Sequence, residues 1–177
     1  IPAEIANLPK PIIGFHGLLA DWVDFELIKK TAEHFKDGSV VLIGKIAVDA
    51  EQKVKVLNDV PNVHFLGRKP YAELPAYCKG FDVALNPFAI NELTLAANPL
   101  KVREYLAAGL PVVSTDIPEV RILPDCLVGT DHDDFIAKIE DAIANPKPRE
   151  AVSDAIAHES WDAKVDELRA LMTAQMP

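Results

Sequence analysis

The sequence predicts an α/β fold in which helices cover both faces of a doubly wound, parallel sheet of about six strands. Short apolar segments alternate with helical patterns about six times along the 177 residues, an order typical of βαβ units. The apolar segments are solid runs, such as 39–43, in place of alternating polar and apolar residues. Solid runs are expected for strands that are buried on both faces, as in parallel sheets.

The first half of the chain contains four predicted strands and three predicted helices. Apolar residues recur at helical spacing over 24–35, whereas the pattern over 50–57 is weak. Gly44 and Gly67 close two of the strands. We expect strands over 11–16, 39–43, 63–66 and 81–85, and helices over 24–35, 50–57 and 71–78.

The second half begins with a polar loop over 89–97, which leads into a short helix. Asn98 is a favoured N-cap residue, Pro99 suits the first helical position, and Gly109 suits a left-handed stop. The acidic run 131–134 is expected to cap a helix and not to bind a metal. We expect strands over 111–114 and 127–128, and further helices over 132–144, 148–157 and 160–172.

Composition divides the chain into three parts. Three of the first eleven residues are prolines, so 1–10 is expected to be an extended interdomain linker. Residues 11–159 form the Rossmann-like domain, and 160–177 form a C-terminal helix. That helix carries one apolar stripe, which suits packing on this domain or on an absent one. The stripe consists of Trp161, Val165, Leu168 and Met172. The chain begins without methionine, which hints at a piece of a longer protein.

Charge and cysteine content exclude several classes of protein. The formal net charge of −9 argues against a nucleic acid or an anionic membrane surface as partner. Cys78 and Cys126 lie far apart without metal-ligand spacing. A reduced, cytoplasmic protein is therefore the simpler expectation, although a disulfide stays open. No apolar run approaches the roughly 20 residues of a transmembrane segment, and the N-terminus does not resemble a signal peptide.

Several common cofactor and catalytic motifs are missing. Only Gly14 and Gly17 follow the pattern of a dinucleotide fingerprint, so a nicotinamide or flavin cofactor is not expected. The sequence also lacks a Walker phosphate-binding motif and a G-x-S-x-G nucleophile elbow. In doubly wound sheets, ligands bind outside the carboxyl ends of the strands. His16, at such an end, is therefore the histidine of greatest interest.

The segment 98–115 is the strongest candidate for a ligand site. Lys101 and Arg103 lie in or beside the first turn of its helix, where cations oppose the helix dipole. A bound anion would reverse that penalty, because free N–H groups and nearby cations together bind phosphate. Glu104 lies about 9 Å from Asn98 along the helix axis, at 1.5 Å per residue. Alternatively, Lys101 and Glu104 simply pair on a solvated face.

Five segments occur in order along nearly the whole chain, and 99–113 is the most specific of them. They are Gly14-x-x-Gly17, Asn62 to Arg68, Tyr71 to Pro75, Phe81 to Val83, and Pro99-Leu100-Lys101-x-x-Glu104 continuing to Val113. Together they resemble the C-terminal nucleotide-sugar donor domain of group 1 (family 4) glycosyltransferases. The resemblance implies a GT-B enzyme that has two Rossmann-like domains, retains anomeric configuration and needs no metal.

The resemblance also implies roles for nine residues. The helix start would present backbone N–H groups to the donor diphosphate, and the glutamate would accept hydrogen bonds from the ribose. Two loops would flank the nucleobase and approach the sugar and phosphates. No catalytic residue, metal or cofactor beyond the nucleotide-sugar substrate is implied. An N-terminal acceptor domain would lie outside this chain, and that domain could bring the protein to a membrane surface. The nine residues are Gly17, Leu18, Arg68, Lys69, Asn98, Pro99, Leu100, Lys101 and Glu104.

Three positions depart from the family pattern. Ala96 stands eight residues before Glu104, where the family has a second glutamate, and Leu18 and Val23 stand where basic residues are usual. The diphosphate charge would then fall on Lys101, with Arg68 or Arg103 in support. We interpret the chain as the donor-binding half of a glycosyltransferase, inactive by itself. A non-catalytic nucleotide-sugar-binding module and a GT-B sugar epimerase are the alternatives, and a receiver-like domain fits less well because it needs acidic strand ends.

Overall fold

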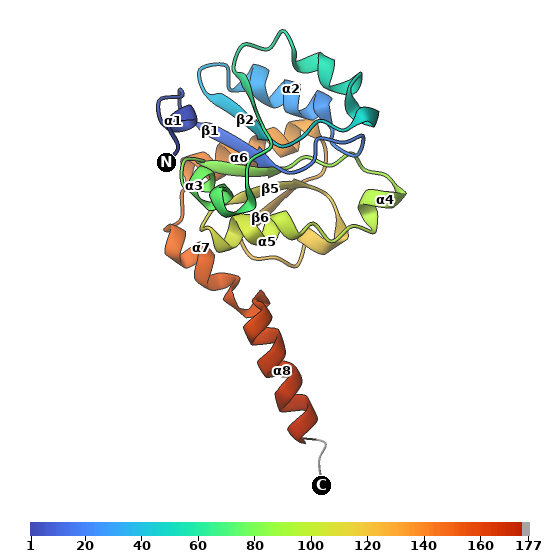
Figure 1. Ribbon diagram of the computed structural model, residues 1–177, viewed down its shortest axis with the longest axis vertical. Helices are drawn as coiled ribbons and strands as arrows, with labels where there is room; N and C mark the ends of the chain where they lie inside the picture. Colours follow the sequence, from blue (N-terminus) through green and yellow to red (C-terminus); the bar gives the residue numbers. More distant parts are fainter. Residues whose placement is uncertain (175–177) are drawn as a thin grey trace.

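The protein folds around one sheet of six parallel strands in the order β3-β2-β1-β4-β5-β6 (Figure 1). The structure is a computed structural model that describes residues 1–174. This strand order is the Rossmann order, and its direction reverses between β1 and β4. The predicted fold class is confirmed. The strands are β1 Ile12–His16, β2 Ser39–Ile43, β3 Val63–Gly67, β4 Val83–Asn86, β5 Val112–Thr115 and β6 Cys126–Gly129.

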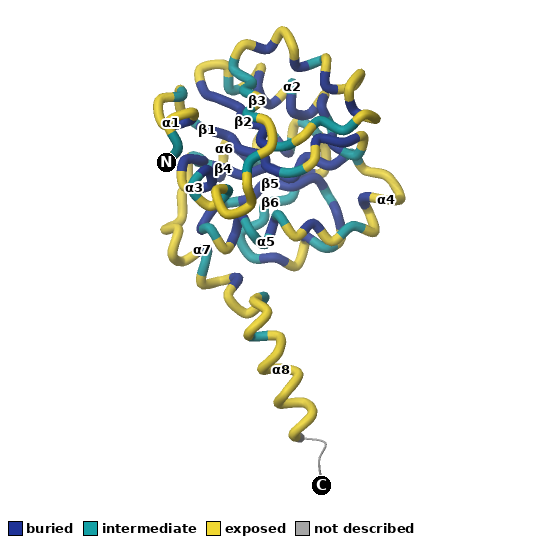
Figure 2. Tube along the Cα trace, viewed as in Figure 1, coloured by how far each residue is buried: buried dark blue, intermediate teal, exposed yellow. Residues whose placement is uncertain are grey.

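The four central strands β2, β1, β4 and β5 are buried at every position. The edge strands β3 and β6 are partly exposed. This explains why the central strands read as solid apolar runs in the sequence: each has a helical layer above and below it. Figure 2 shows the buried sheet between its exposed coverings.

Helices cover both faces of the sheet. One apolar core lies beneath α2 and α6, and the other lies beneath α3, α5 and α7. Asp24 caps α2 by accepting a hydrogen bond from the N–H of Leu27 at 2.9 Å, and Asp131 caps α6 through the N–H of Asp134 at 2.8 Å. The capping role predicted for the acidic run 131–134 is confirmed. The helices are α2 Phe25–His34, α3 Leu74–Cys78, α5 Leu100–Ala107, α6 His132–Ala144 and α7 Arg149–Ala155.

Several connecting segments differ from the predicted elements. The weak pattern over 50–57 forms two 3₁₀ turns, Val48–Ala50 and Lys53–Leu57. The predicted helix over 71–78 divides into a 3₁₀ turn, Tyr71–Glu73, and α3, because Pro75 occupies the first turn of α3, where its missing N–H costs nothing. The loop 89–97 contains a short helix, α4 Glu92–Leu95, which Asn91 and Thr94 fix with a reciprocal capping box.

Residues 1–10 are not extended, contrary to the prediction from their prolines. They contain a short helix, α1 Ala3–Ala6, which buries Ile5 completely. The carboxylate of Glu4 accepts hydrogen bonds from the Lys69 ammonium at 2.8 Å and from the Tyr77 hydroxyl. The segment therefore belongs to the folded domain, and its role as an interdomain linker stays a prediction.

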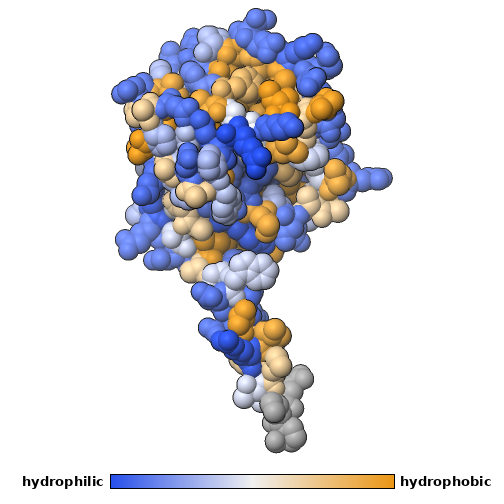
Figure 3. All heavy atoms as spheres, viewed as in Figure 1, coloured by the Kyte–Doolittle hydropathy of each residue, from blue (hydrophilic) through white to orange (hydrophobic). Residues whose placement is uncertain are grey.

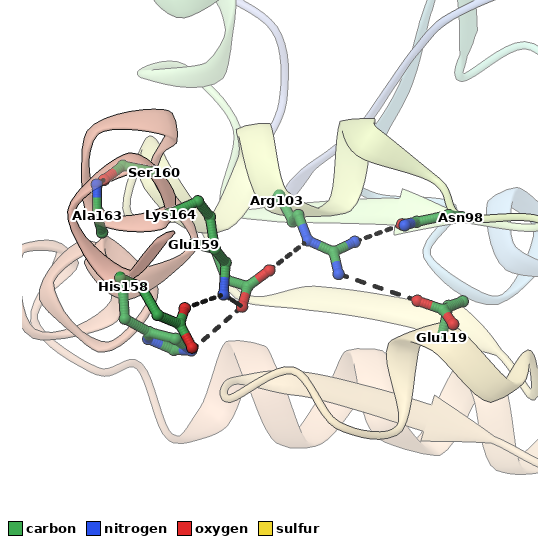
Figure 4. A network of polar contacts seen from close by, with 9 residues as sticks. Asn98, Arg103, Glu119, His158, Glu159, Ser160, Ala163 and Lys164 are labelled. Atoms are coloured by element: carbon green, nitrogen blue, oxygen red, sulfur yellow. Dashed lines mark hydrogen bonds and ion pairs between the residues drawn. The ribbon is translucent and has the colours of Figure 1, made fainter. Parts of the chain in front are cut away.

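The last described helix, α8 Trp161–Ala174, projects away from the domain. Its predicted apolar stripe is exposed, with Trp161 86% exposed and Met172 62% exposed (Figures 2 and 3). The end of the predicted segment, 175–177, lies outside the described residues. Polar contacts join the base of α8 to the domain, because Glu159 accepts from Lys164 at 3.2 Å and from Arg103 at 3.0 Å (Figure 4).

Deletion of residues 161–177 is expected to leave the stability of the domain almost unchanged. The helix contributes no buried side chain to either core, so its removal should change the free energy of unfolding by no more than about 0.5 kcal/mol. Thermal unfolding checks this, with Val152→Ala in α7 as a control that removes buried apolar volume. A melting temperature lowered by more than about 5 °C in the deletion variant would show that α8 packs on the domain.

Two open points from the sequence are settled within residues 1–174. Cys78 and Cys126 are both free, so they do not form a disulfide with each other. Burial raises the pKa of the Cys78 thiol to about 11 and that of Cys126 to about 12. No helix in the described part of the chain is both long enough and apolar enough to cross a bilayer.

Candidate functional site

Two adjoining hollows lie at the carboxyl edge of the sheet, where ligands bind in doubly wound folds. The first has a volume of about 310 Å³, and the loops after β1, β2 and β3 line it. Four predicted site residues meet there: Gly17, Leu18, Arg68 and Lys69. The second hollow, of about 90 Å³, contains Glu104 and shares His16 with the first. A hollow of about 420 Å³ at the opposite edge of the sheet contains none of the predicted residues.

Backbone hydrogen bonds hold the loops of the first hollow together beyond the ends of the strands. The N–H of Gly17 donates to the carbonyl of Ile43 at 2.9 Å, and the N–H of Gly44 donates to the carbonyl of Gly67 at 2.9 Å. Gly44 has a φ of +157°, and a Cβ atom there would lie 1.8 Å from the carbonyl oxygen of Gly17. Only glycine therefore permits this close approach of the first two loops.

The start of α5 has no side-chain cap, although the sequence predicts that Asn98 caps it. The helix begins at Leu100, and the buried Pro99 occupies the N-cap position. Asn98 is instead engaged by Arg103, whose guanidinium donates to the Asn98 side-chain oxygen at 2.5 Å. The prediction of Asn98 as the N-cap is therefore wrong by one position. The helix start keeps backbone N–H groups that no side chain caps, as an anion site requires.

Lys101 extends from the first turn of α5 to the point where the strand order reverses. Its ammonium lies 4.6 Å from the ring centre of Phe15 in β1 and 4.5 Å from that of Phe88 after β4. Burial lowers the pKa of Lys101 to about 8. Within residues 1–174, no carboxylate lies within 4.0 Å of this ammonium and no acceptor hydrogen-bonds it. The alternative in which Lys101 and Glu104 pair on a solvated face is therefore wrong.

Glu104, one turn further along α5, faces the second hollow. The Tyr71 hydroxyl donates to its Oε1 at 2.7 Å, and this hydrogen bond raises the pKa of Tyr71. The Nε2 of His16 lies 3.9 Å from its Oε2. Sequence reasoning noted His16 because of its strand-end position but missed Tyr71, which has no local signal of a site.

The other basic residues of the predicted site are placed differently. Arg103 is used by the fold, because it contacts Glu159 at 3.0 Å and Glu119 at 4.0 Å in addition to Asn98 (Figure 4). The expectation that Arg103 supports Lys101 is therefore not met by this arrangement. The ammonium of Lys69 is held by Glu4. The exposed Arg68 lines the first hollow.

The part of the chain that the structure describes contains no group of three or more histidine, cysteine, aspartate or glutamate side chains arranged to hold a metal ion. His132, within the acidic run at the start of α6, instead contacts Asp24 at 2.9 Å, which links α6 to the N-cap of α2. The run therefore serves the packing of two helices on one face of the sheet.

The fold and this edge of the sheet define a Rossmann-like domain with a ligand hollow at its topological switch point. The model of the family "Glycosyl transferases group 1" matches residues 10–145, which is well over half of the chain. The chain therefore belongs to the group 1 glycosyltransferases, as the sequence motifs predict. The receiver-like alternative is wrong.

Similar proteins agree with this assignment. The chain is 31% identical over 134 residues to the Bacillus subtilis (strain 168) protein named "Putative teichuronic acid biosynthesis glycosyltransferase TuaH", covering 73% of this chain and 34% of that protein. Among solved structures, Anabaena Alr3699/HepE in complex with UDP and glucose has a TM-score of 0.71 at 18% identity, over 97% of this chain and 50% of that one. S. aureus TarM, in a complex that contains UDP, has a TM-score of 0.69 at 16% identity, over 97% and 38%.

The chain spans about a third of the length of this curated relative and about half of the HepE chain. The structural likenesses, below 20% identity, support the GT-B type of Rossmann-like domain and nothing finer. Activity, substrates and partners of a whole enzyme do not follow from them.

Proposed function

We propose that this chain is the donor-binding half of a glycosyltransferase that transfers a sugar from a nucleoside diphosphate sugar. The ammonium of Lys101 is the observation that carries the proposal. It is desolvated, it has no anionic partner among residues 1–174, and it lies at the uncapped start of α5. A buried charge without a partner is costly, so its retention favours a bound anion. A diphosphate is the anion that the family uses.

The geometry suggests how such a ligand would lie along α5. Lys101 and the helix start would bind the diphosphate, and Glu104, about 4.5 Å further along the axis, would bind the ribose. The larger hollow beside Arg68 and Lys69 would then receive the nucleobase. Gly17, above the Lys101 ammonium, leaves room for a phosphate, because a Cβ atom there would lie 2.9 Å from Nζ.

During transfer, the leaving nucleoside diphosphate gains negative charge. In this chain Lys101 and the N–H groups of α5 would stabilise that charge without a metal. Retention of configuration is the outcome that the family resemblance implies. Ala96 and Leu18, which replace charged residues of the family pattern, leave fewer groups for the sugar and the phosphates. We therefore expect this chain alone to bind the donor weakly and to transfer nothing without an acceptor domain.

Calorimetric titration with UDP, GDP and ADP tests the proposal directly. We expect one of the three to bind, and to bind more tightly than its nucleoside, because only the diphosphate reaches Lys101. UDP is the first choice, since the HepE and TarM complexes contain it. Absence of heat with all three, in a sample whose folding is confirmed by circular dichroism, would overturn the proposal.

Replacement of Glu104 by glutamine is expected to weaken binding of that diphosphate about 10- to 100-fold, as for loss of a hydrogen bond to a charged group of about 1.5–3 kcal/mol. Uridine should lose as much as UDP, because both carry the ribose. Glu92→Gln is the matched control, since Glu92 is exposed on α4, away from both hollows. Unchanged UDP affinity in the Glu104 variant would remove the ribose from this position.

A further inference from the structure

The imidazole of His16 is a buried polar group that the proposed donor site does not yet explain. His16 ends β1, is only 5% exposed, and lines both hollows. Within residues 1–174, neither ring nitrogen has a hydrogen-bond partner, since the nearest carboxylate oxygen, on Glu104, lies 3.9 Å from Nε2. Buried polar groups are almost always hydrogen-bonded, so an unpartnered one that faces a hollow points to a ligand.

The fold fixes the position of this ring. The hydroxyl of Tyr105 accepts a hydrogen bond from the N–H of His16 at 2.6 Å and donates to its carbonyl at 3.3 Å. The Tyr105 ring also packs edge-on against the imidazole, with 4.5 Å between ring centres. Because Tyr105 is fully buried in α5, it holds His16 and the neighbouring Glu104 in one fixed arrangement. Such rigidity suits a binding group and is not needed for a residue that only fills space.

The separation between His16 and Glu104 selects the chemistry of the bound group. With 3.9 Å between Nε2 and Oε2, one oxygen atom can lie about 2.8 Å from both. Burial, followed by the charge of Lys101, lowers the pKa of His16 to about 4, so the ring is neutral near pH 7. The carboxylate accepts hydrogen bonds only, and it would repel a phosphate oxygen. A hydroxyl can donate to Glu104 and accept from the Nε2–H of His16 at the same time.

We propose that His16 is a second binding residue for the ligand hydroxyl that Glu104 accepts from, and that the pair gives the site its preference for ribose over deoxyribose. This inference rests on the proposed donor site, because it requires the ribose to lie at Glu104. Tyr71 is the third member of the cluster, since its hydroxyl occupies Oε1 of Glu104 and leaves Oε2 to the ligand.

The test compares UDP with 2′-deoxy-UDP and 3′-deoxy-UDP, using wild-type protein and His16→Phe. Phenylalanine keeps a ring against Tyr105 and removes both nitrogens. We expect His16→Phe to weaken UDP binding roughly five- to tenfold, as for loss of one hydrogen bond. Binding of the analogue that lacks the shared hydroxyl should change less than twofold. His34→Phe, at a partly exposed histidine on α2, is the matched control and should bind like wild type.

Wild-type protein gives an independent measurement if the variant folds poorly. With ¹⁵N-labelled histidine, the ring nitrogens of His16 should shift on addition of UDP and shift less with the deoxy analogue that lacks the shared hydroxyl. Equal losses for UDP and both analogues in His16→Phe, or ring nitrogens that do not respond to UDP, would overturn the role of His16 while leaving the donor site intact. Wild-type protein that binds none of the nucleoside diphosphates would instead overturn the donor site itself.

Discussion

Replacement of Lys101 by methionine is expected to weaken UDP binding roughly 10- to 150-fold, while the affinity for uridine stays within about twofold. A hydrogen bond between charged groups contributes about 1.5–3 kcal/mol, and only the diphosphate makes it. Methionine keeps an unbranched side chain of similar length between Phe15 and Phe88, so the packing of α5 on the sheet is retained. Calorimetric titration with the two ligands measures the difference.

The same variant is expected to be at least as stable as the wild type at pH 7. Burial lowers the pKa of Lys101 to about 8 from 10.5, so the folded state disfavours the charged form by about 3 kcal/mol. Contacts of the ammonium with two aromatic rings offset about 1–2 kcal/mol of this. Methionine removes both effects, and the free energy of unfolding should rise by about 1–2 kcal/mol.

The pH dependence of stability gives a second measure of this lysine. Below pH 8 both the folded and the unfolded chain bind the Lys101 proton, so the penalty is constant. Between pH 8 and 10.5 the unfolded chain binds the proton and the folded chain has lost it, so stability gains a contribution that rises with pH. Urea unfolding of wild type and Lys101→Met at pH 7 and pH 10 should therefore show a difference that shrinks at the higher pH.

The matched control is Lys30→Met, which removes an exposed lysine from α2. It should change neither UDP affinity nor the pH dependence of stability, since exposed charges contribute little. An equal loss of UDP and uridine binding in Lys101→Met would mean that the lysine shapes the site without touching the diphosphate. A variant that binds UDP like the wild type would remove Lys101 from the site altogether.

The sheet could be predicted because its signal is local. A strand covered on both faces must be apolar throughout, so segments such as 39–43 identify themselves, and the parallel arrangement follows from the helices between them. The first hollow then follows from topology, because parallel strands deliver the loops at Gly17 and Arg68 to the same edge of the sheet. The binding of a ligand by these loops stays a prediction.

The contacts that give the site its chemistry could not be predicted in the same way. Lys101 is desolvated because Phe15 and Phe88, from β1 and from the loop after β4, meet on either side of it. Asn98 has the residue type of an N-cap, but Arg103 engages its side chain, and the helix begins one residue later. Both outcomes depend on partners that only the folded chain brings together.

The two ends of the chain show what an amphipathic pattern leaves open. The prolines of 1–10 suggested an extended segment, yet Ile5 has a place in the core beneath α1. The stripe on α8 indicates a helical face that favours burial, but within the described residues it contacts no core. A periodic pattern specifies a face and not the surface that covers it.

Replacement of Gly44 by alanine is expected to lower the free energy of unfolding by about 3–4 kcal/mol and the melting temperature by about 10 °C. The new Cβ atom would lie 1.8 Å from the carbonyl oxygen of Gly17. Because this is a backbone atom held by the hydrogen bond between Gly17 and Ile43, it cannot move away without separating the loops after β1 and β2. The positive φ of +157° adds strain for any residue with a Cβ.

Gly67→Ala is the matched control for Gly44→Ala, because Gly67 also ends a strand at the same edge and has a φ of +65°. A Cβ atom at Gly67 meets nothing within 4 Å, so alanine there should cost only the left-handed conformation, about 1–2 kcal/mol. Urea unfolding separates the two variants. UDP affinity should fall further in Gly44→Ala, since displacement of Gly17 moves the loop above Lys101. Equal effects of the two substitutions on stability would show that the loops can separate, and that their close contact does not hold the hollow in shape.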